Sequence, residues 1–410
     1  MKWTLMHKNI PVVDMTTVDS NGSISNFGII HNYEHLPVGT VPLVGKDSGK
    51  LRKTKLDEWW SNRSIPGSRE GLYPALRSMG LKNAKELLLL GNALSLSDHY
   101  WVKPFQSDIK WENINYFDND FSLDVGKALF GHGIAELKNI NKNSPNSTSP
   151  GNLMKQWLNT EPRMLQKAGS NAFLQEPFNE YIAYKLADAL NVSHIKYEIG
   201  SENDQFYSLC DNFVTKDTEL VSAWSVLACF ELTQEDFMEQ TANCAGRLGI
   251  GNIRNNLDKM LTLDYIIANG DRHFNNFGFL RNPNTLEWQG FAPLYDSGAS
   301  LWYNKTIGAV GVDIRSEATG DMMSKQLNLV SDLSWLQKTA LTPDVIIGDI
   351  RDILDLNVIS GYVEKERNQK IAMELANRYD IVLTRAGVST QANKPGIIHF
   401  AMPEIIDMNN

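Results

Sequence analysis

The chain has 410 residues, too many for one ordinary hydrophobic core, so its length predicts two or three domains. Hydrophobic residues make up 42% and charged residues 21%, as in a folded soluble protein, and 29 glycines with 15 prolines are too few for a disordered or collagen-like chain. The 39 basic and 48 acidic residues give a formal net charge of −9, which argues against a generally basic nucleic-acid-binding protein.

The cysteine pattern and the hydropathy of the chain indicate a cytoplasmic protein. Cys210, Cys229 and Cys244 are odd in number, widely spaced and without a CxxC pair, which favours a reducing compartment over a disulfide framework or a structural zinc site. The longest uncharged apolar-rich run, Leu220–Phe230, is far shorter than the ~20 residues of a membrane span. The first residues, MKWTLMHKNI, become polar before an apolar signal core can form.

Residues 1–115 predict a small mixed α/β accessory domain. Short alternating and β-branched runs in residues 1–30 are broken at Asn21-Gly22, which indicates a β-hairpin. Residues 51–60 and 81–90 have the spacing of helices. No residues of this part point to chemistry.

A polar stretch follows at residues 139–152, NINKNSPNSTSPGN, and its composition predicts a loop. Two interpretations stay open for this loop. It is either a linker or a flexible loop over a phosphate site.

The patterns in the remainder of the sequence predict strands first and helices afterwards. A strand over residues 162–168, which contains Lys167, precedes a helix over 178–190 and further strands over 192–199 and 205–214. Helical patterns then dominate, at residues 220–231, 256–268, 344–354 and 363–379. This order predicts an α+β fold with its β part first, which suggests two lobes.

One predicted hairpin, with strands at residues 277–280 and 286–291, interrupts the helical part and is flanked by the residues that carry chemistry. The string NGDRHFNN stands before the hairpin, with Asp271 and Asn276 five positions apart. The string PLYDSG stands after it and contains Asp296. Each of these residues alone is also compatible with an ordinary turn.

Together with Lys167, these groups match the needs of phosphoryl transfer. Asp271 would be the base that accepts the proton of the attacking hydroxyl. Asn276 and Asp296 would be magnesium ligands, because Mg²⁺ prefers oxygen atoms, and Lys167 would neutralise phosphate charge. Protein kinases use the same order, Asp-x-x-x-x-Asn, then a hairpin, then Asp-x-Gly.

These strings resemble the HipA family of bacterial serine/threonine kinases, the toxin-type kinases of HipA–HipB modules. GDRHFNNFGF and PLYDSG carry the resemblance, and Asn179-Glu-Tyr181 and Asp211-x-Phe213 extend it backwards. It covers residues 120–385.

The resemblance implies ATP and Mg²⁺ as cofactors and a role for each matching residue. Asp271 is then the catalytic base, with Lys167 on the ATP phosphates and Asn276 and Asp296 on magnesium. The other implied nucleotide-site residues are Glu180 as the helix partner of the lysine, Asp211 and Phe213 beside the adenine, and His273 and Tyr295. Simpler interpretations remain for four of these residues: a strand-edge lysine, a surface charge at Glu180, a core residue at Phe213, and a packed or capping histidine at 273.

The fold implied by the resemblance is a two-lobed protein-kinase-like fold behind the small mixed N-terminal domain. The β-rich N-lobe would span residues 116–215 and the helical C-lobe residues 216–388. Residues 389–410 would form a tail.

HipA kinases can autophosphorylate a loop serine, and the residues of this chain that the resemblance offers are Ser147 and Ser149. The stretch around them, Ser144–Gly151, has no GxGxxG pattern. A phosphate there would place negative charge where ATP phosphates bind, so the two would exclude one another.

The leading functional hypothesis is an ATP- and Mg²⁺-dependent serine/threonine protein kinase of the HipA type, acting as the toxin of a toxin–antitoxin module. Its partners would be a protein substrate with a Ser/Thr hydroxyl and a HipB-like antitoxin, with no direct nucleic-acid binding and no membrane. The alternative is a kinase for a small molecule or a lipid, because GDRHxxN also resembles the catalytic loop of phosphoinositide kinases. A third class is a non-enzymatic pseudokinase or scaffold.

Overall fold

The computed structural model describes residues 1–19, 21–130, 140–231, 236–338, 341–360, 363–388 and 399–409. Residues 389–398 of the predicted tail therefore lie outside the described residues. The chain divides into two compact units, each made of segments that are distant in sequence. Unit 1 consists of Met1–Gln166, Asp211–Thr233 and Phe279–Gln289, and unit 2 of Lys167–Cys210, Gln234–Gly278 and Gly290–Asn410.

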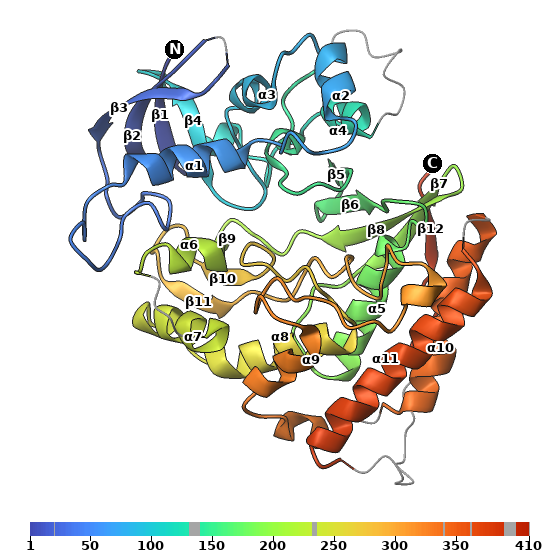
Figure 1. Cartoon of the computed structure of the whole chain (residues 1–410). Coiled ribbons are helices and arrows are strands. Elements are labelled where there is room, and N and C mark those ends of the chain that lie inside the picture. Colours follow the sequence, from blue (N-terminus) through green and yellow to red (C-terminus); the bar gives the residue numbers. More distant parts are fainter. Residues whose placement is uncertain are drawn as a thin grey trace. The chain divides into compact units, whose positions relative to one another are not determined.

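Unit 1 contains an antiparallel sheet with the strand order β3-β2-β1-β4 (Figure 1). Its strands are β1 (Lys2–His7), β2 (Ile10–Thr17), β3 (Ile24–Ile30) and β4 (Tyr100–Pro104). The predicted hairpin is confirmed, because β2 pairs with β3 across the Asn21-Gly22 turn. Gly22 has a φ of 68°, a left-handed backbone that glycine adopts easily because it has no Cβ.

Unit 1 also contains the short helices α1 (Lys53–Arg63), α2 (Leu72–Ser78), α3 (Ala84–Leu90) and α4 (Asp124–Leu129). Leu56 and Trp60 of α1 are buried in the same apolar core as Leu5 and Val13 of the sheet. The predicted helices over 51–60 and 81–90 correspond to α1 and α3. No predicted helix corresponds to α2, whose Pro74 interrupts the helical pattern. In the first turn of a helix proline is tolerated, because its missing N–H would have no partner there anyway.

The middle of the polar stretch of unit 1, residues 144–149, is buried. It forms the 3₁₀ turn η3 (Pro145–Thr148) ahead of strand β5 (Lys155–Leu158). Ser144, Asn146 and Ser147 are all 0% exposed. This burial argues against the linker interpretation for residues 144–149. Its polar groups are compatible with burial because they are hydrogen-bonded, as with Asn146 Oδ1, which accepts from the Trp157 N–H at 2.7 Å.

Unit 2 contains the strands that follow this stretch, in the order β12-β7-β8-β6, and the boundary between the units runs through β6. The strands are β6 (Met164–Ala168), β7 (Glu198–Glu202), β8 (Gln205–Asp211) and β12 (Ile405–Asp407). The predicted strand over 192–199 is wrong for most of its length, because β7 begins only at Glu198. Residues 192–197 mix buried and exposed positions without a strict alternation, and they make only an isolated bridge, between His194 and Leu294.

Four helices of unit 2 lie close to predicted ranges, and two others, at 237–247 and 323–326, have no predicted counterpart. They are α5 (Glu176–Ala189), α7 (Phe237–Arg247), α8 (Ile253–Ile266), α9 (Met323–Gln326), α10 (Pro343–Asp355) and α11 (Lys365–Arg385). The predictions over 178–190, 256–268, 344–354 and 363–379 are thereby confirmed, with ends that shift by a few residues. Helices α10 and α11 pack side by side (Figure 1).

A third sheet, ordered β11-β10-β9, contains the predicted hairpin. Strands β10 (Gly278–Arg281) and β11 (Trp288–Phe291) form this hairpin, which is confirmed, and β9 (Glu219–Ser222) is their neighbour. The helix predicted over 220–231 is wrong at its start, which is strand β9, and shorter than expected, because α6 spans only Ala223–Leu227. The helices and sheets together confirm the α+β class. Among the described residues, no helix combines the length and apolar character that a membrane crossing requires.

Candidate active site

Lys167, at the end of β6, lies between two carboxylates of unit 2. Its Nζ donates to Glu180 Oε1 and to Asp296 Oδ1, each at 2.8 Å. Lys167 is 5% and Glu180 1% exposed. The interpretations of Lys167 as a strand-edge lysine and of Glu180 as a surface helix charge are therefore wrong. A charge buried this deeply is unfavourable unless an oppositely charged group pairs with it.

The electrostatics of this group favour a permanently charged lysine. Burial by itself would lower the pKa of Lys167, but the negative charges of Asp296 and Glu180 outweigh it and raise this pKa well above its ordinary value. The Tyr197 hydroxyl also accepts from Lys167 Nζ, at 3.3 Å. Burial raises the pKa of Tyr197 well above its usual range, so this hydroxyl stays neutral.

Helix α5 positions the segment that contains Asp296. The second oxygen of Glu180, Oε2, accepts from the Ser297 N–H at 2.8 Å. The adjacent Asn179 donates from Nδ2 to the carbonyls of Gly298 and Ser300, both at 2.8 Å. Asp296 has a φ of 58°, a left-handed backbone that is uncommon for a residue other than glycine. Two neighbouring residues of α5 therefore fix both groups. Glu180 binds Lys167, and Glu180 and Asn179 together bind the strained turn that contains Asp296.

Asp271 and Asn276 lie in the loop that follows α8. Asn276 Nδ2 donates to the Asp271 carbonyl at 2.9 Å and to its carboxylate Oδ2 at 3.4 Å. The Asp271 side chain is exposed, yet the protein around it removes part of its hydration and raises its pKa. His273 opposes this rise and the charge of Asp296 adds to it, so the two aspartates share one electrostatic environment.

A buried arginine that the sequence analysis did not select holds this loop in place. Arg272 Nη1 donates to the carbonyls of Asn276 and Tyr295, each at 2.6 Å. Its Nε and Nη2 bind the carboxylate of Asp264 in α8. One signal could have found this pair. Asp264 stands in the apolar helical string LTLDYII, where a buried carboxylate needs a cation.

The structure places the other predicted nucleotide-site residues as follows. His273 Nδ1 accepts from the Asn275 N–H at 3.2 Å, and the Tyr295 hydroxyl donates to the Asn275 carbonyl at 3.2 Å. Asp211 is the exposed last residue of β8 and Phe213 is half-buried, and both belong to unit 1. The predicted roles of these four residues stay predictions.

The two candidate phosphorylation sites also belong to unit 1 and are buried. Ser147 Oγ donates to the Ser144 carbonyl at 3.1 Å. Ser149 Oγ accepts from Arg69 Nη1 at 2.9 Å. Neither hydroxyl is exposed in this conformation.

The donor set of unit 2 fits magnesium. Asn276 commits Nδ2 to Asp271, so the amide oxygen is its atom for a cation. With the carboxylate of Asp296, this gives a pair of oxygen donors, one amide and one carboxylate, of the kind that Mg²⁺ prefers. Lys167, a cation beside Asp296, suits a phosphate group bound to such an ion.

The chain belongs to the family described as the HipA-like C-terminal domain, which matches residues 148–354, half of the chain. The matched range contains all the site residues of unit 2 discussed above.

Two known proteins are similar to this chain. Serine/threonine-protein kinase CtkA of Helicobacter pylori is 24% identical over 140 residues, 30% of this chain and only 40% of CtkA. Its crystal structure, titled as a proinflammatory kinase, has 16% identity and a TM-score of 0.43 over 58% of this chain and 92% of CtkA. HipA of Shewanella oneidensis, solved in complex with HipB and operator DNA, has a TM-score of 0.53 at 12% identity, over 94% of this chain and all of HipA. This last likeness shows a shared fold.

Proposed function

We propose that this protein is an ATP- and Mg²⁺-dependent serine/threonine protein kinase of the HipA type. The observation that carries the proposal is the buried Lys167, held by Glu180 and Asp296 in the unit that also presents Asp271 and Asn276. Membership of the HipA-like family and the partial likeness to CtkA, a serine/threonine kinase, support a kinase-like enzyme.

The residues divide the work in the following way. Bound ATP with Mg²⁺ would supply the transferable phosphoryl group and part of the charge neutralisation. Asn276 and Asp296 hold the metal, and Lys167 contacts the phosphates. Glu180 keeps the lysine in place, which supports catalysis by positioning and electrostatics.

Asp271 acts as the base in this proposal. The oxygen of the substrate hydroxyl forms the new bond to the γ-phosphorus, its proton goes to the Asp271 carboxylate, and the bond to the β–γ bridging oxygen breaks to release ADP. The exposure of Asp271 supports this role, because a macromolecular substrate has to reach it.

The proposal includes the two-lobed plan that the sequence predicts. The N-lobe spans 116–215 and the C-lobe 216–388, behind an accessory domain over 1–115 and ahead of a tail over 389–410. As the family resemblance implies, Asp211 and Phe213 are proposed as adenine-contacting residues, and His273 and Tyr295 as nucleotide-contacting residues.

The proposed biological setting is a toxin–antitoxin module. The similar HipA was solved with HipB and operator DNA, which supports a HipB-like antitoxin as partner. Autophosphorylation at Ser147 or Ser149 belongs to the proposal as well. Because both hydroxyls are buried, it requires η3 to leave its packed position first.

The test is to incubate the purified chain with Mg²⁺ and γ-labelled ATP, alone and with a bacterial protein extract, beside an Asp271→Asn variant. We expect label on serine or threonine with the wild type only, mapped by mass spectrometry. Magnesium-dependent ATP binding without protein label would overturn the protein-kinase proposal in favour of a small-molecule or lipid kinase. Absence of ATP binding would overturn both and favour a non-enzymatic scaffold.

A further inference from the structure

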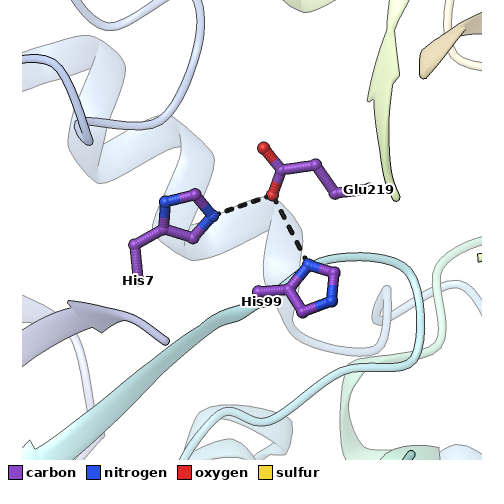
Figure 2. Close-up of side chains that lie close together, drawn as sticks. All are labelled: His7, His99 and Glu219. Atoms are coloured by element: carbon purple, nitrogen blue, oxygen red, sulfur yellow. Dashed lines mark hydrogen bonds and ion pairs between the residues drawn. The ribbon is translucent and has the colours of Figure 1, made fainter. Parts of the chain in front are cut away.

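A second group of chemically capable side chains lies in unit 1, the part in which the sequence pointed to no chemistry. His7 at the end of β1, His99 directly before β4 and Glu219 at the start of β9 point toward one another (Figure 2). His7 and Glu219 are 212 positions apart in the chain. The three residues are buried, each at most 1% exposed, and one ligand atom from each lies within 4.8 Å of the others.

His99 is the member of this group that protein contacts leave unsatisfied. Among the described residues, neither of its ring nitrogens has a hydrogen-bond partner, although the residue is buried. Its Nδ1 faces Glu219 Oε2 at 3.8 Å, too far for a hydrogen bond (Figure 2). The Phe117 ring stacks on the imidazole, with centroids 5.0 Å apart. Burying such polar atoms without a partner is unfavourable, so a further group at this position would stabilise the fold.

We propose that His7, His99 and Glu219 bind one divalent transition-metal ion, and that the ion is Zn²⁺. Two imidazole nitrogens and a carboxylate oxygen form a set that zinc accepts in proteins, and they suit Mg²⁺ or Ca²⁺ poorly.

The separations of the ligand atoms agree with a zinc ion between them. With metal–ligand bonds of 2.0–2.1 Å, two ligands of a tetrahedral zinc lie about 3.3 Å apart. His7 Nε2 and Glu219 Oε2 are 3.0 Å apart, which is shorter than this spacing. His99 Nδ1 and Glu219 Oε2 are 3.8 Å apart, which is longer. A shift of a few tenths of an ångström would bring both pairs to the spacing of a bound ion.

The surrounding residues have the arrangement that supports metal ligands. Ligating imidazoles usually hydrogen-bond through their other nitrogen, and ligating carboxylates are hydrogen-bonded in turn. His7 Nδ1 lies 2.8 Å from His35 Nδ1, and Arg281 Nε donates to Glu219 Oε1 at 2.7 Å. The oxygen that faces the two histidines, Oε2, is thus separate from the one that Arg281 binds.

A direct hydrogen bond between His7 and Glu219 is the competing explanation for this group. It would account for the short contact between the two residues without an ion. It leaves both nitrogens of His99 without a hydrogen bond, whereas a metal ion would bind Nδ1 of His99 together with His7 Nε2 and Glu219 Oε2.

The ion would be structural. It would join the ends of β1 and β9 to the residue before β4, and so tie together three segments that are far apart in sequence. Within the part of the chain that the structure describes, the group contains no fourth histidine, cysteine, aspartate or glutamate, so water would complete the coordination. The site uses none of the residues proposed for phosphoryl transfer, and its test is independent of kinase activity.

The first test is elemental analysis of the whole wild-type chain, loaded with Zn²⁺ and then dialysed into metal-free buffer. We expect about one zinc ion per chain, and zinc should raise the thermal unfolding midpoint of chelator-treated protein. A wild type that retains no zinc, and whose midpoint does not respond to it, overturns the proposal even if no variant folds.

The second test compares zinc affinities, measured against a competing chelator. His99→Gln should weaken binding at least about hundredfold, and His35→Ala about 10- to 100-fold, as for other residues that support a metal ligand. His31→Gln is the matched control, because His31 also pairs with a carboxylate of unit 1, Asp14, at 3.0 Å. It should bind zinc as the wild type does. Equal affinities of wild type, His99→Gln and His31→Gln would place the zinc elsewhere and overturn the proposal.

Discussion

Arg272 and Asp264 form a two-pronged ion pair whose side chains are both completely buried. Arg272 Nε lies 2.9 Å from Asp264 Oδ2, and Nη2 lies 3.0 Å from Oδ1. Asp264 belongs to α8, whereas Arg272 stands in the loop between Asp271 and Asn276, so the pair fastens that loop to the preceding helix. The planar guanidinium suits this contact, because its fork matches a carboxylate and leaves donors for nearby carbonyls.

Removal of this arginine should destabilise the protein strongly. Arg272→Ala leaves the buried carboxylate of Asp264 without its cation, so we expect the free energy of unfolding to fall by about 3–5 kcal/mol. Denaturant unfolding measures this change. The control is Arg351→Ala, which removes an exposed pair with Asp352 and should change stability by at most about 1 kcal/mol. Similar losses in the two variants would contradict a supporting role for Arg272.

Asp271→Asn should abolish most of the proposed activity and leave the fold intact. An amide cannot accept the hydroxyl proton, and loss of a general base typically lowers the rate about 10²- to 10⁴-fold. Steady-state label transfer from ATP measures the effect. Asp344→Asn, at an exposed position of α10, is the matched control and should transfer label at the wild-type rate. A fully active Asp271→Asn protein would assign the base to another residue.

Glu180→Gln should weaken ATP binding through Lys167. The substitution keeps the size of the side chain but removes one of the two negative charges that raise the pKa of Lys167 and hold its ammonium. We expect the affinity for ATP to fall about tenfold, which corresponds to 1.4 kcal/mol, in calorimetric titrations. Glu198→Gln removes a surface pair with Lys196 and should leave binding unchanged. If both variants bind ATP as the wild type does, Lys167 does not contact the phosphates.

The protein should lose stability on mild acidification because of His194. Burial lowers the pKa of His194 to about 3, with smaller contributions from the charges of Arg272 and Lys167. The unfolded chain takes up a proton below a pH of about 6.5, while the folded chain does not. The stability from this group is therefore complete above that pH and is lost progressively as the pH falls towards 3.

Between pH 6.5 and pH 5 we expect a loss of about 1 kcal/mol, below the full linkage value because the side chain is only half-buried. Denaturant unfolding at several pH values measures it. A His194→Gln variant cannot take up this proton, so its stability should change less over the same range. Identical pH profiles for the two proteins would refute this origin of the loss.

Local patterns predicted well those parts of the fold in which neighbours in sequence are neighbours in space. The β2–β3 hairpin turns at Asn21-Gly22, and the β10–β11 hairpin and helices α5, α8, α10 and α11 lie near their predicted ranges, because helical spacing and turn residues act over a few positions. The prediction of a strand over 192–199 was wrong for the opposite reason, because strand pairing depends on residues that are distant in sequence. A sequence pattern can indicate an extended backbone, but a strand also needs a hydrogen-bonded partner along its length.

By itself, the sequence determined the identity and order of the chemical groups: Lys167 on a strand, then Asp271 and Asn276 before a hairpin and Asp296 after it. Tertiary structure alone decided which groups meet. It paired Lys167 with Glu180 and Asp296, buried the polar stretch around Ser147, and joined His7 and His99 to Glu219. The physical reason is that burial and contact between distant segments depend on how whole elements pack, and no short window of sequence contains that information.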